Sequence, residues 1–356
     1  MNYKPEYIAQ IASTIKANLD TSIYNIQDLS ERTGVIAING RIEAARSGTQ
    51  GVGFRIVANE FSHLNDEIIE ISVQMQEKIS EEVQRLIGIS EGMAKQVRGE
   101  RLSQIALSIM DVIDRNLYER TCDVRWWATD PSLVDALNTQ KTEQEQYASE
   151  RLGIILDSYT VYLDLFLINA RGAIVSNGRE NIHKVKGKSC SDAVWFKKAL
   201  LSSSGDEYSF QSTHASPLVN NEKVLVYSCR VDDRNNNSNE PLGVLGIFFN
   251  WKGLVDAVLG RICSLDLKED LEVHQIPTDI HIIDETGIVL ASTSEKGEGE
   301  KISLPHLEKI LSSRKNDYEI IESSDGFRLI AYGYSPGFET YATGWYCLID
   351  QKISQN

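Results

Sequence analysis

Apolar side chains recur at helical spacing through the first third of the chain, where alternating steps of three and four predict a coiled-coil seam. This stretch, from about Tyr7 to Leu117, is free of proline. The seam consists of Ile8, Ile15, Ser22, Leu29 and Ile36, with Ala12, Leu19, Ile26 and Thr33 between them. The pattern therefore predicts a long amphipathic helix whose apolar face needs a partner.

Three glycines, Gly48, Gly51 and Gly53, interrupt this pattern. Each would cost about 1 kcal/mol relative to alanine inside a helix, so the helix is expected to end there. Helical periodicity resumes at Phe54 and continues through Val112. We therefore expect an antiparallel helical hairpin over residues 1–100, with its turn near 48–53. A single hairpin buries such a seam only in part, which predicts a homodimer or higher assembly through the helical arms.

After Arg120 the chain changes to short strand-like runs bounded by turn residues. The expected strands are 161–168, 173–176, 224–230, 244–249, 280–283, 288–292, 318–322, 328–334 and 345–349, with short helices at 192–202, 251–259 and 304–312. Strand, turn, strand, helix and further strands occur in this order twice. The fold class is therefore α+β: the hairpin, a long helix with a first module over 101–262, and a second module over 263–356.

Charge, hydropathy and cysteine usage indicate which partners and which cellular compartment to expect. The chain has 36 Lys and Arg against 51 Asp and Glu, a formal charge of −15, which argues against nucleic acid as a partner. No apolar window reaches the roughly 20 residues of a membrane span, and the N-terminus lacks the apolar core of a signal peptide. The five cysteines are scattered, which predicts free thiols in a cytoplasmic protein.

Catalytic and metal-binding motifs are missing from the sequence. The six histidines are dispersed, with no His-x-x-x-His or His-Glu pairing, and no Cys-x-x-Cys pair occurs. The spacing of a nucleophile elbow is also lacking. The glycine turn is not a phosphate loop, because no Lys-Ser/Thr follows it and a helix precedes it. We therefore expect neither an enzyme, nor a metal site, nor a cofactor.

The turn itself carries a specific motif. The residues that carry it are Asn39, Ile42-Glu43-Ala44-Ala45-Arg46, Gly48, Gln50-Gly51, Gly53-Phe54, Val57-Ala58 and Glu60. Over residues 26–64 the chain resembles the signalling tip of methyl-accepting chemotaxis receptors. The resemblance implies that this tip packs dimers together and contacts the chemotaxis kinase and its adaptor. The tip residues would then be Asn39, Glu43, Arg46, Gln50, Phe54 and Val57.

Some positions depart from that family pattern. Gly40-Arg41 stands where the family has two alanines, and Val52 stands where it has a basic residue. The pair Glu81-Glu82 lacks the small flanking residues of a methylation site, so we do not predict methylation. Coupling to an adaptor therefore stays open at this point.

Residues 101–356 resemble a double Cache sensor, in which a long helix is followed by two stacked PAS-like modules. The carriers are 116–130 in the helix, 165–172, 187–189 with Trp195-Phe196, 242–247, 282–289 and Gly344-Trp345. The resemblance implies that a small molecule binds in the first module. We expect Trp126 and Trp127 to pack where the long helix meets this module.

Two charged positions that bind amino acids in part of that family are replaced here, by Ala193 and Phe248. A ligand carboxylate and an α-ammonium group would both lack their partner, which disfavours an ordinary amino acid. The remaining candidate ligand contacts are aromatic or hydroxylic: Tyr162, Trp195, Phe196, Tyr208, Ser212, Tyr227 and Phe248. Each of these aromatics, taken alone, fits a hydrophobic core better than a ligand contact.

Together these features predict a soluble chemoreceptor-like sensor. It would bind a small molecule in the Cache domain and signal through the hairpin to the chemotaxis kinase and adaptor. The alternative is a ligand-controlled coiled-coil assembly module without kinase coupling.

Overall fold

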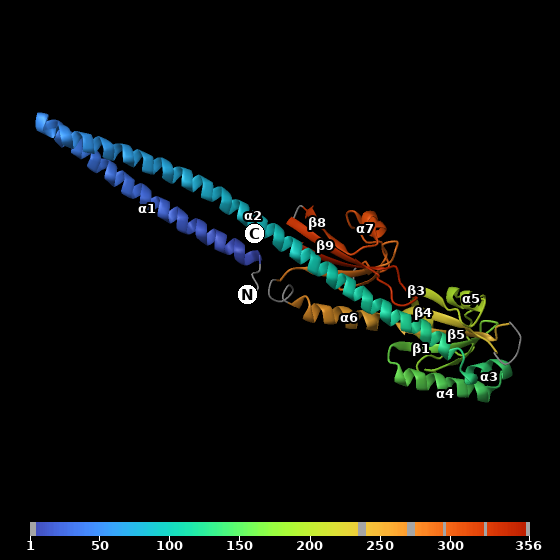
Figure 1. Cartoon of the computed structure of the whole chain (residues 1–356). Helices are drawn as coiled ribbons and strands as arrows, with labels where there is room; N and C mark the ends of the chain where they lie inside the picture. Colours follow the sequence, from blue (N-terminus) through green and yellow to red (C-terminus); the bar gives the residue numbers. More distant parts are fainter. Residues whose placement is uncertain (1–4, 234–239, 269–274, 295–296, 324–325, 354–356) are drawn as a thin grey trace. The chain divides into compact units, whose positions relative to one another are not determined.

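The computed structural model describes residues 5–233, 240–268, 275–294, 297–323 and 326–353. The chain divides into two compact units at Arg98/Gly99. We refer to residues 1–98 as the hairpin unit and to residues 99–356 as the sheet unit, and describe each by itself (Figure 1).

The hairpin unit consists of two antiparallel helices, as the periodicity predicts (Figure 1). Helix α1 (Pro5–Arg46) leads into a short 3₁₀ turn, η1 (Gly48–Gly51), and α2 (Val52–Trp127) returns. Gly51 explains the tightness of this turn, because an added Cβ would lie 2.1 Å from the carbonyl oxygen of Ala44. Only glycine permits such an approach of two backbones.

Helix α2 continues into the sheet unit and ends at Trp127. Two helices follow that the sequence analysis did not predict, α3 (Pro131–Thr139) and α4 (Thr142–Ser158). Asp130 caps α3 by accepting a hydrogen bond from the Ser132 amide, and proline occupies the first turn. This Asp-Pro signal is typical of a helix start and was available in the sequence.

The first module is built on a five-stranded antiparallel sheet with the order β2-β1-β5-β4-β3. Its strands are β1 (Tyr162–Asn169), β2 (Ile174–Asn177), β3 (Ser209–Ser216), β4 (Glu222–Val231) and β5 (Gly243–Asn250). The other elements are α5 (Val194–Leu200), the 3₁₀ turn η2 (Pro217–Val219) and α6 (Trp251–Leu265). Strand β3 was missed because its run of polar side chains lacks the alternation of a half-buried strand.

The second module repeats the first. Its sheet has the order β7-β6-β10-β9-β8, which is the same connectivity shifted by five strands. The strands are β6 (Thr278–Ile283), β7 (Val289–Ser292), β8 (Asp317–Ser323), β9 (Gly326–Tyr334) and β10 (Tyr346–Ile353), and the helix is α7 (Leu307–Ser313). The α+β fold with two PAS-like sheets, predicted from the weak repeat, is confirmed.

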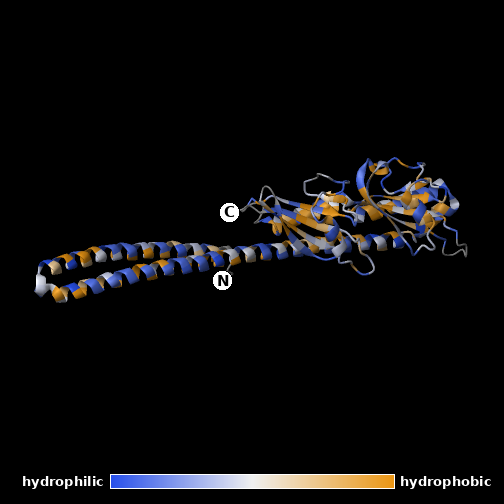
Figure 2. Cartoon of the chain, turned by 90° about the horizontal axis from the view of Figure 1, so that it is seen from above, coloured by the Kyte–Doolittle hydropathy of each residue, from blue (hydrophilic) through white to orange (hydrophobic). Residues whose placement is uncertain are grey.

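Residues 102–127 of α2 form the spine on which both sheets pack, and the strands appear as orange, apolar segments in Figure 2. At one end, an added Cβ on Gly333 of β9 would lie 2.3 Å from the backbone nitrogen of Leu107. At the other end, the Arg120 guanidinium lies 5.2 Å from the ring centroid of Tyr162. One continuous hydrophobic cluster therefore joins α2 to both modules.

Candidate functional site

The six predicted tip residues surround the turn of the hairpin, and all of them are exposed. Phe54 has 73 % of its surface exposed, which is unusual for a phenylalanine in a folded protein. Glu43 and Arg46 lie one turn apart on α1 with 3.6 Å between their charged groups. The tip thus offers an aromatic side chain and a charge pair to a partner rather than to its own core.

The helices of the hairpin meet through small side chains, which differs from the predicted seam. The buried residues of the hairpin unit are Ala12, Ile23, Ser30, Ala37, Ala44, Gly51, Ala58, Asn65, Ser72, Val83 and Ser90. By contrast, Leu29 and Ile36 of the predicted seam are 62 % and 70 % exposed. Small residues allow the two backbones to approach closely, as the 3.4 Å between an added Gly40 Cβ and Ala58 shows. The larger apolar residues then point outward.

The seven predicted ligand contacts do not come together in one place. Trp195 and Phe196 on α5 and Phe248 on β5 lie on one face of the first sheet, with 5.6 Å between the ring centroids of Trp195 and Phe248. All three are at most 3 % exposed. Strand β5 places the next residue, Phe249, on the opposite face, because successive side chains alternate.

Tyr162, Tyr208 and Tyr227 lie on the face of the sheet that meets α2, and Ser212 is exposed on β3. The Tyr162 hydroxyl donates a hydrogen bond to Asp123 on α2. Burial raises the pKa of the Asp123 carboxyl, although Tyr162 and the nearby Arg120 partly offset that shift. These tyrosines join the sheet to the spine.

The two tryptophans at the end of α2 differ in burial. Trp127 is buried where the helix meets the first module, as expected, but the expectation for Trp126 is wrong, because 69 % of it is exposed.

A buried polar cluster on β1 was not predicted as part of a site. Asp164 is fully buried and accepts hydrogen bonds from the Asn177 amide group at 2.8 Å and the Arg179 backbone N–H at 3.0 Å. The imidazole of His183 lies 2.8 Å from the same carboxylate. A carboxylate within an otherwise apolar strand is the sequence signal that could have found it. The cluster fixes the segment between β2 and α5.

A second buried carboxylate, Asp114 on α2, holds the segment 335–343 of the second module. It accepts hydrogen bonds from the Ser335 hydroxyl at 2.6 Å, the Gly337 amide at 2.8 Å and the Thr343 hydroxyl at 2.8 Å. The Thr343 amide, at 3.2 Å, adds a fourth. Asp114 thus binds the segment directly to the spine, and the sequence carries no motif that reveals it.

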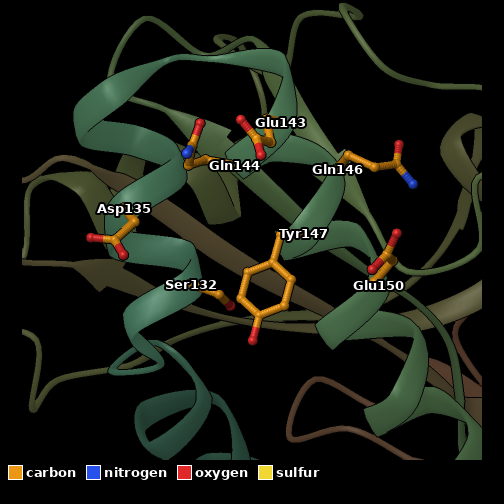
Figure 3. Close-up of a pocket in the computed structure, with 7 residues that line it drawn as sticks. All are labelled: Ser132, Asp135, Glu143, Gln144, Gln146, Tyr147 and Glu150. Carbon is orange, nitrogen blue, oxygen red and sulfur yellow. The ribbon is translucent and has the colours of Figure 1, made fainter.

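A pocket with a volume of about 460 Å³ lies between α3 and α4 (Figure 3). Tyr147 lies in its middle, with the carboxylates of Asp135, Glu143 and Glu150 around it. No basic side chain lines this pocket, so it would repel an anion.

Reactive groups are scarce in the part of the chain that the structure describes. No cluster of three or more His, Cys, Asp or Glu side chains there could hold a metal ion, and no helix there is long and apolar enough to cross a membrane. The five cysteines are free thiols in the structure, and Cys190, Cys229 and Cys347 are buried. Burial raises the pKa of the Cys190 thiol to about 11 and that of Cys347 further, which makes both poor nucleophiles.

Comparison with known proteins supports both sequence resemblances. Residues 6–116 match the family model of the methyl-accepting chemotaxis protein (MCP) signalling domain. The chain is 31 % identical over 164 residues to the methyl-accepting chemotaxis protein PctB of Pseudomonas aeruginosa, covering 40 % of this chain and 25 % of that protein. It is 51 % identical over 45 residues to the biofilm dispersion protein BdlA of the same organism, covering 12 % of this chain and 11 % of BdlA. The chain spans a quarter or less of the length of the curated relatives that it matches.

A solved structure is similar to a larger share of the chain. The ligand-binding domain of the amino acid chemoreceptor PctC of Pseudomonas aeruginosa, solved with GABA, superimposes with a TM-score of 0.52 at 15 % identity. The match covers 72 % of this chain and all of that domain. The chain therefore combines a segment similar to the MCP signalling domain with a fold of the double Cache type.

Proposed function

We propose that this chain, which joins an MCP signalling hairpin to a double Cache fold, is a chemoreceptor-like sensor. The sheet unit would bind a small molecule, and the hairpin would pass the binding state to a chemotaxis kinase and its adaptor. The observation that carries the proposal is the tip, where the family motif coincides with an exposed Phe54 and an exposed Glu43–Arg46 pair.

Pairing of two chains is part of this proposal. The hairpin buries small residues and exposes large ones, so a second hairpin is the partner that would cover Leu29 and Ile36. Burying one such side chain contributes about 1.5–3 kcal/mol, and each residue counts twice in a symmetric dimer.

A route from ligand to tip follows the chain itself. Helix α2 is continuous from Val52 beside the turn to Trp127 in the first module. Asp114 and Asp123 bind it to the second and first modules, respectively. A ligand that favours one arrangement of the modules would therefore bias the position of α2.

The test is a reconstituted kinase assay with purified kinase, adaptor and the full chain. We expect the chain to change the rate of kinase autophosphorylation, and we expect Phe54→Ala at the tip to abolish that change. The matched control is Ile89→Ala, an exposed apolar residue on the same helix but away from the turn. If neither the chain nor its variants alter the kinase, the coupling is refuted.

The alternative is an assembly module that has lost kinase coupling. The departures at Gly40-Arg41 and Val52 favour it, because they change the surface next to the tip. A chain that forms a dimer and binds a ligand, yet leaves the kinase unaffected, would support this second function.

A further inference from the structure

A cavity of about 250 Å³ lies where the two modules of the sheet unit meet. Tyr208 and Phe210, at the start of β3, line it from the first module. The segment 340–345 lines it from the second module, with Tyr341 and Trp345 as its large side chains. The cavity is on the side of the first sheet that faces α2, away from Trp195 and Phe248.

The aromatic rings around this cavity come from both modules. The centroids of Phe210 and Trp345 are 6.3 Å apart, and those of Phe210 and Tyr227 are 5.0 Å apart. The hydroxyl oxygens of Tyr227 and Tyr341 lie 2.8 Å apart across the module boundary. Aromatic pairs prefer separations of about 4.5–7 Å, so a further ring in the cavity would find several edges and faces at the favoured distance.

One wall of the cavity is held in place before any ligand arrives. Thr343 of that wall binds Asp114 through both its amide and its hydroxyl, and Gly337 binds the same carboxylate. A ligand therefore would not have to order the 340–345 segment on binding. Such preorganisation reduces the free-energy cost of association.

Size and charge limit what fits. An apolar cavity of about 150 Å³ accommodates benzene, so 250 Å³ has room for one substituted ring. No charged side chain lines the cavity, and charged groups of both signs lie behind its lining: the Arg125 guanidinium is 5.7 Å from the ring centroid of Tyr208, and the Asp114 carboxylate accepts a hydrogen bond from the Thr343 hydroxyl at 2.8 Å. A charged ligand of either sign would lose water without gaining an oppositely charged partner in the lining, so the lining suits a neutral ligand.

We propose that this cavity between the modules binds a neutral small molecule that is built on a single aromatic ring. The proposal deepens the sensor function by placing the ligand at the module boundary, next to the Asp114 contact with α2. The cavity proposal depends on the proposed sensor function in one respect: it takes the sheet unit to be the part that binds a ligand. Binding can be measured whether or not the hairpin couples to a kinase.

Calorimetric titration of the full chain tests the proposal with three probes that share one ring: benzyl alcohol, benzoate and benzylamine. We expect benzyl alcohol to bind with a Kd of about 1 mM or lower, and benzoate and benzylamine each to bind at least tenfold more weakly. The proposal is overturned if benzyl alcohol does not bind below about 10 mM, or if either charged probe binds as tightly as benzyl alcohol.

Variants at the mouth locate the site. Ala342 is exposed, and Ala342→Phe should fill the cavity and weaken binding at least tenfold without disturbing the core. Thr340→Phe, at a second exposed position of the mouth, should do the same and replaces Ala342→Phe if that variant unfolds. The matched control is Ser212→Phe, on exposed β3 outside the cavity lining, which should bind like the wild type. The proposal is contradicted if the folded mouth variants bind the probe as tightly as the wild type, or if Ser212→Phe weakens binding.

Discussion

The two units of this chain bury their apolar side chains in opposite ways. Among the described residues, roughly two thirds of the exposed large apolar side chains lie between Tyr7 and Val97, in the hairpin unit. The helices there meet through residues such as Ala37, Ala44 and Ala58. The sheet unit instead encloses large side chains, among them Trp251 and Tyr227, in one cluster around α2.

This difference indicates which unit covers most of its large apolar side chains within one chain. The sheet unit satisfies its hydrophobic surface within one chain, so its stability should not depend on a second copy. The hairpin unit leaves Leu29 and Ile36 in water unless another helix covers them. The comparison therefore assigns the contact of the proposed dimer to the hairpin unit.

The largest expected effect tests the claim of completeness in the sheet unit. Trp195→Ala should lower the free energy of unfolding by about 3–5 kcal/mol, because it removes a side chain that is 97 % buried between α5 and β5. Calorimetry would record this as a drop in Tm of roughly 10 °C. Trp126→Ala, the same substitution at an exposed tryptophan, should change stability by less than about 0.5 kcal/mol. Equal effects of the two substitutions would contradict the assignment.

Removing the hydrogen bonds of Asp114 should lower the free energy of unfolding nearly as much as Trp195→Ala. Asp114→Ala leaves the Ser335, Gly337 and Thr343 donors without their acceptor, which should cost about 3 kcal/mol. Asp256→Ala is the control, because Asp256 is exposed and pairs with Lys252 one turn away on α6. Its expected cost is below about 1 kcal/mol. Chemical denaturation of the two variants side by side gives the answer.

In the hairpin, a small residue should be harder to replace than a large one. Ala37→Leu would overpack the contact between the helices and cost about 1–3 kcal/mol. The exposed Val35, two residues away, should accept leucine with almost no change in helix stability. Loss of helical circular dichroism on heating compares the two variants. Equal melting curves would show that Ala37 does not lie between the helices.

The smallest expected effect concerns acid stability of the second module. Burial opposes ionisation of Glu319, but hydrogen bonds from Lys309 and His306 outweigh it and lower the pKa of the carboxyl. A lowered pKa in the folded state adds stability above the unfolded value and is lost as the pH falls below about 4. Glu319→Gln should therefore reduce the loss of unfolding free energy between pH 7 and pH 3 by under about 1 kcal/mol, measured by chemical denaturation at the two pH values. Glu322→Gln, at an exposed position on the same strand, should leave that loss unchanged.

Much of the fold could be predicted from the sequence because its signals are local. The turn at 48–53 follows from glycines, and most strands follow from short apolar runs between turn residues. The polar strand β3 was not predicted because its burial comes from tertiary contacts rather than from a regular pattern, whereas the Asp-Pro start signal of α3 was present in the sequence and was missed.

The sites were harder to predict than the elements. The sequence identifies the aromatic residues Trp195, Tyr227 and Phe248, but it does not show that the sheet separates them onto two faces. The role of Asp114 depends on residues more than 200 positions away, so no spacing rule could reveal it. Likewise, the periodicity places Leu29 and Ile36 on an apolar helix face, but it does not show whether that face packs within the hairpin or against another chain.

The most direct test of the account is the mass of the full chain in solution. Light scattering at tens of micromolar should give at least twice the 39.9 kDa of one chain, since the exposed side of the hairpin needs a second copy. Ile36→Glu should lower that mass toward a single chain, whereas Arg32→Glu, at an exposed polar position, should not. A uniform monomer of 39.9 kDa for the wild-type chain would contradict the central claim.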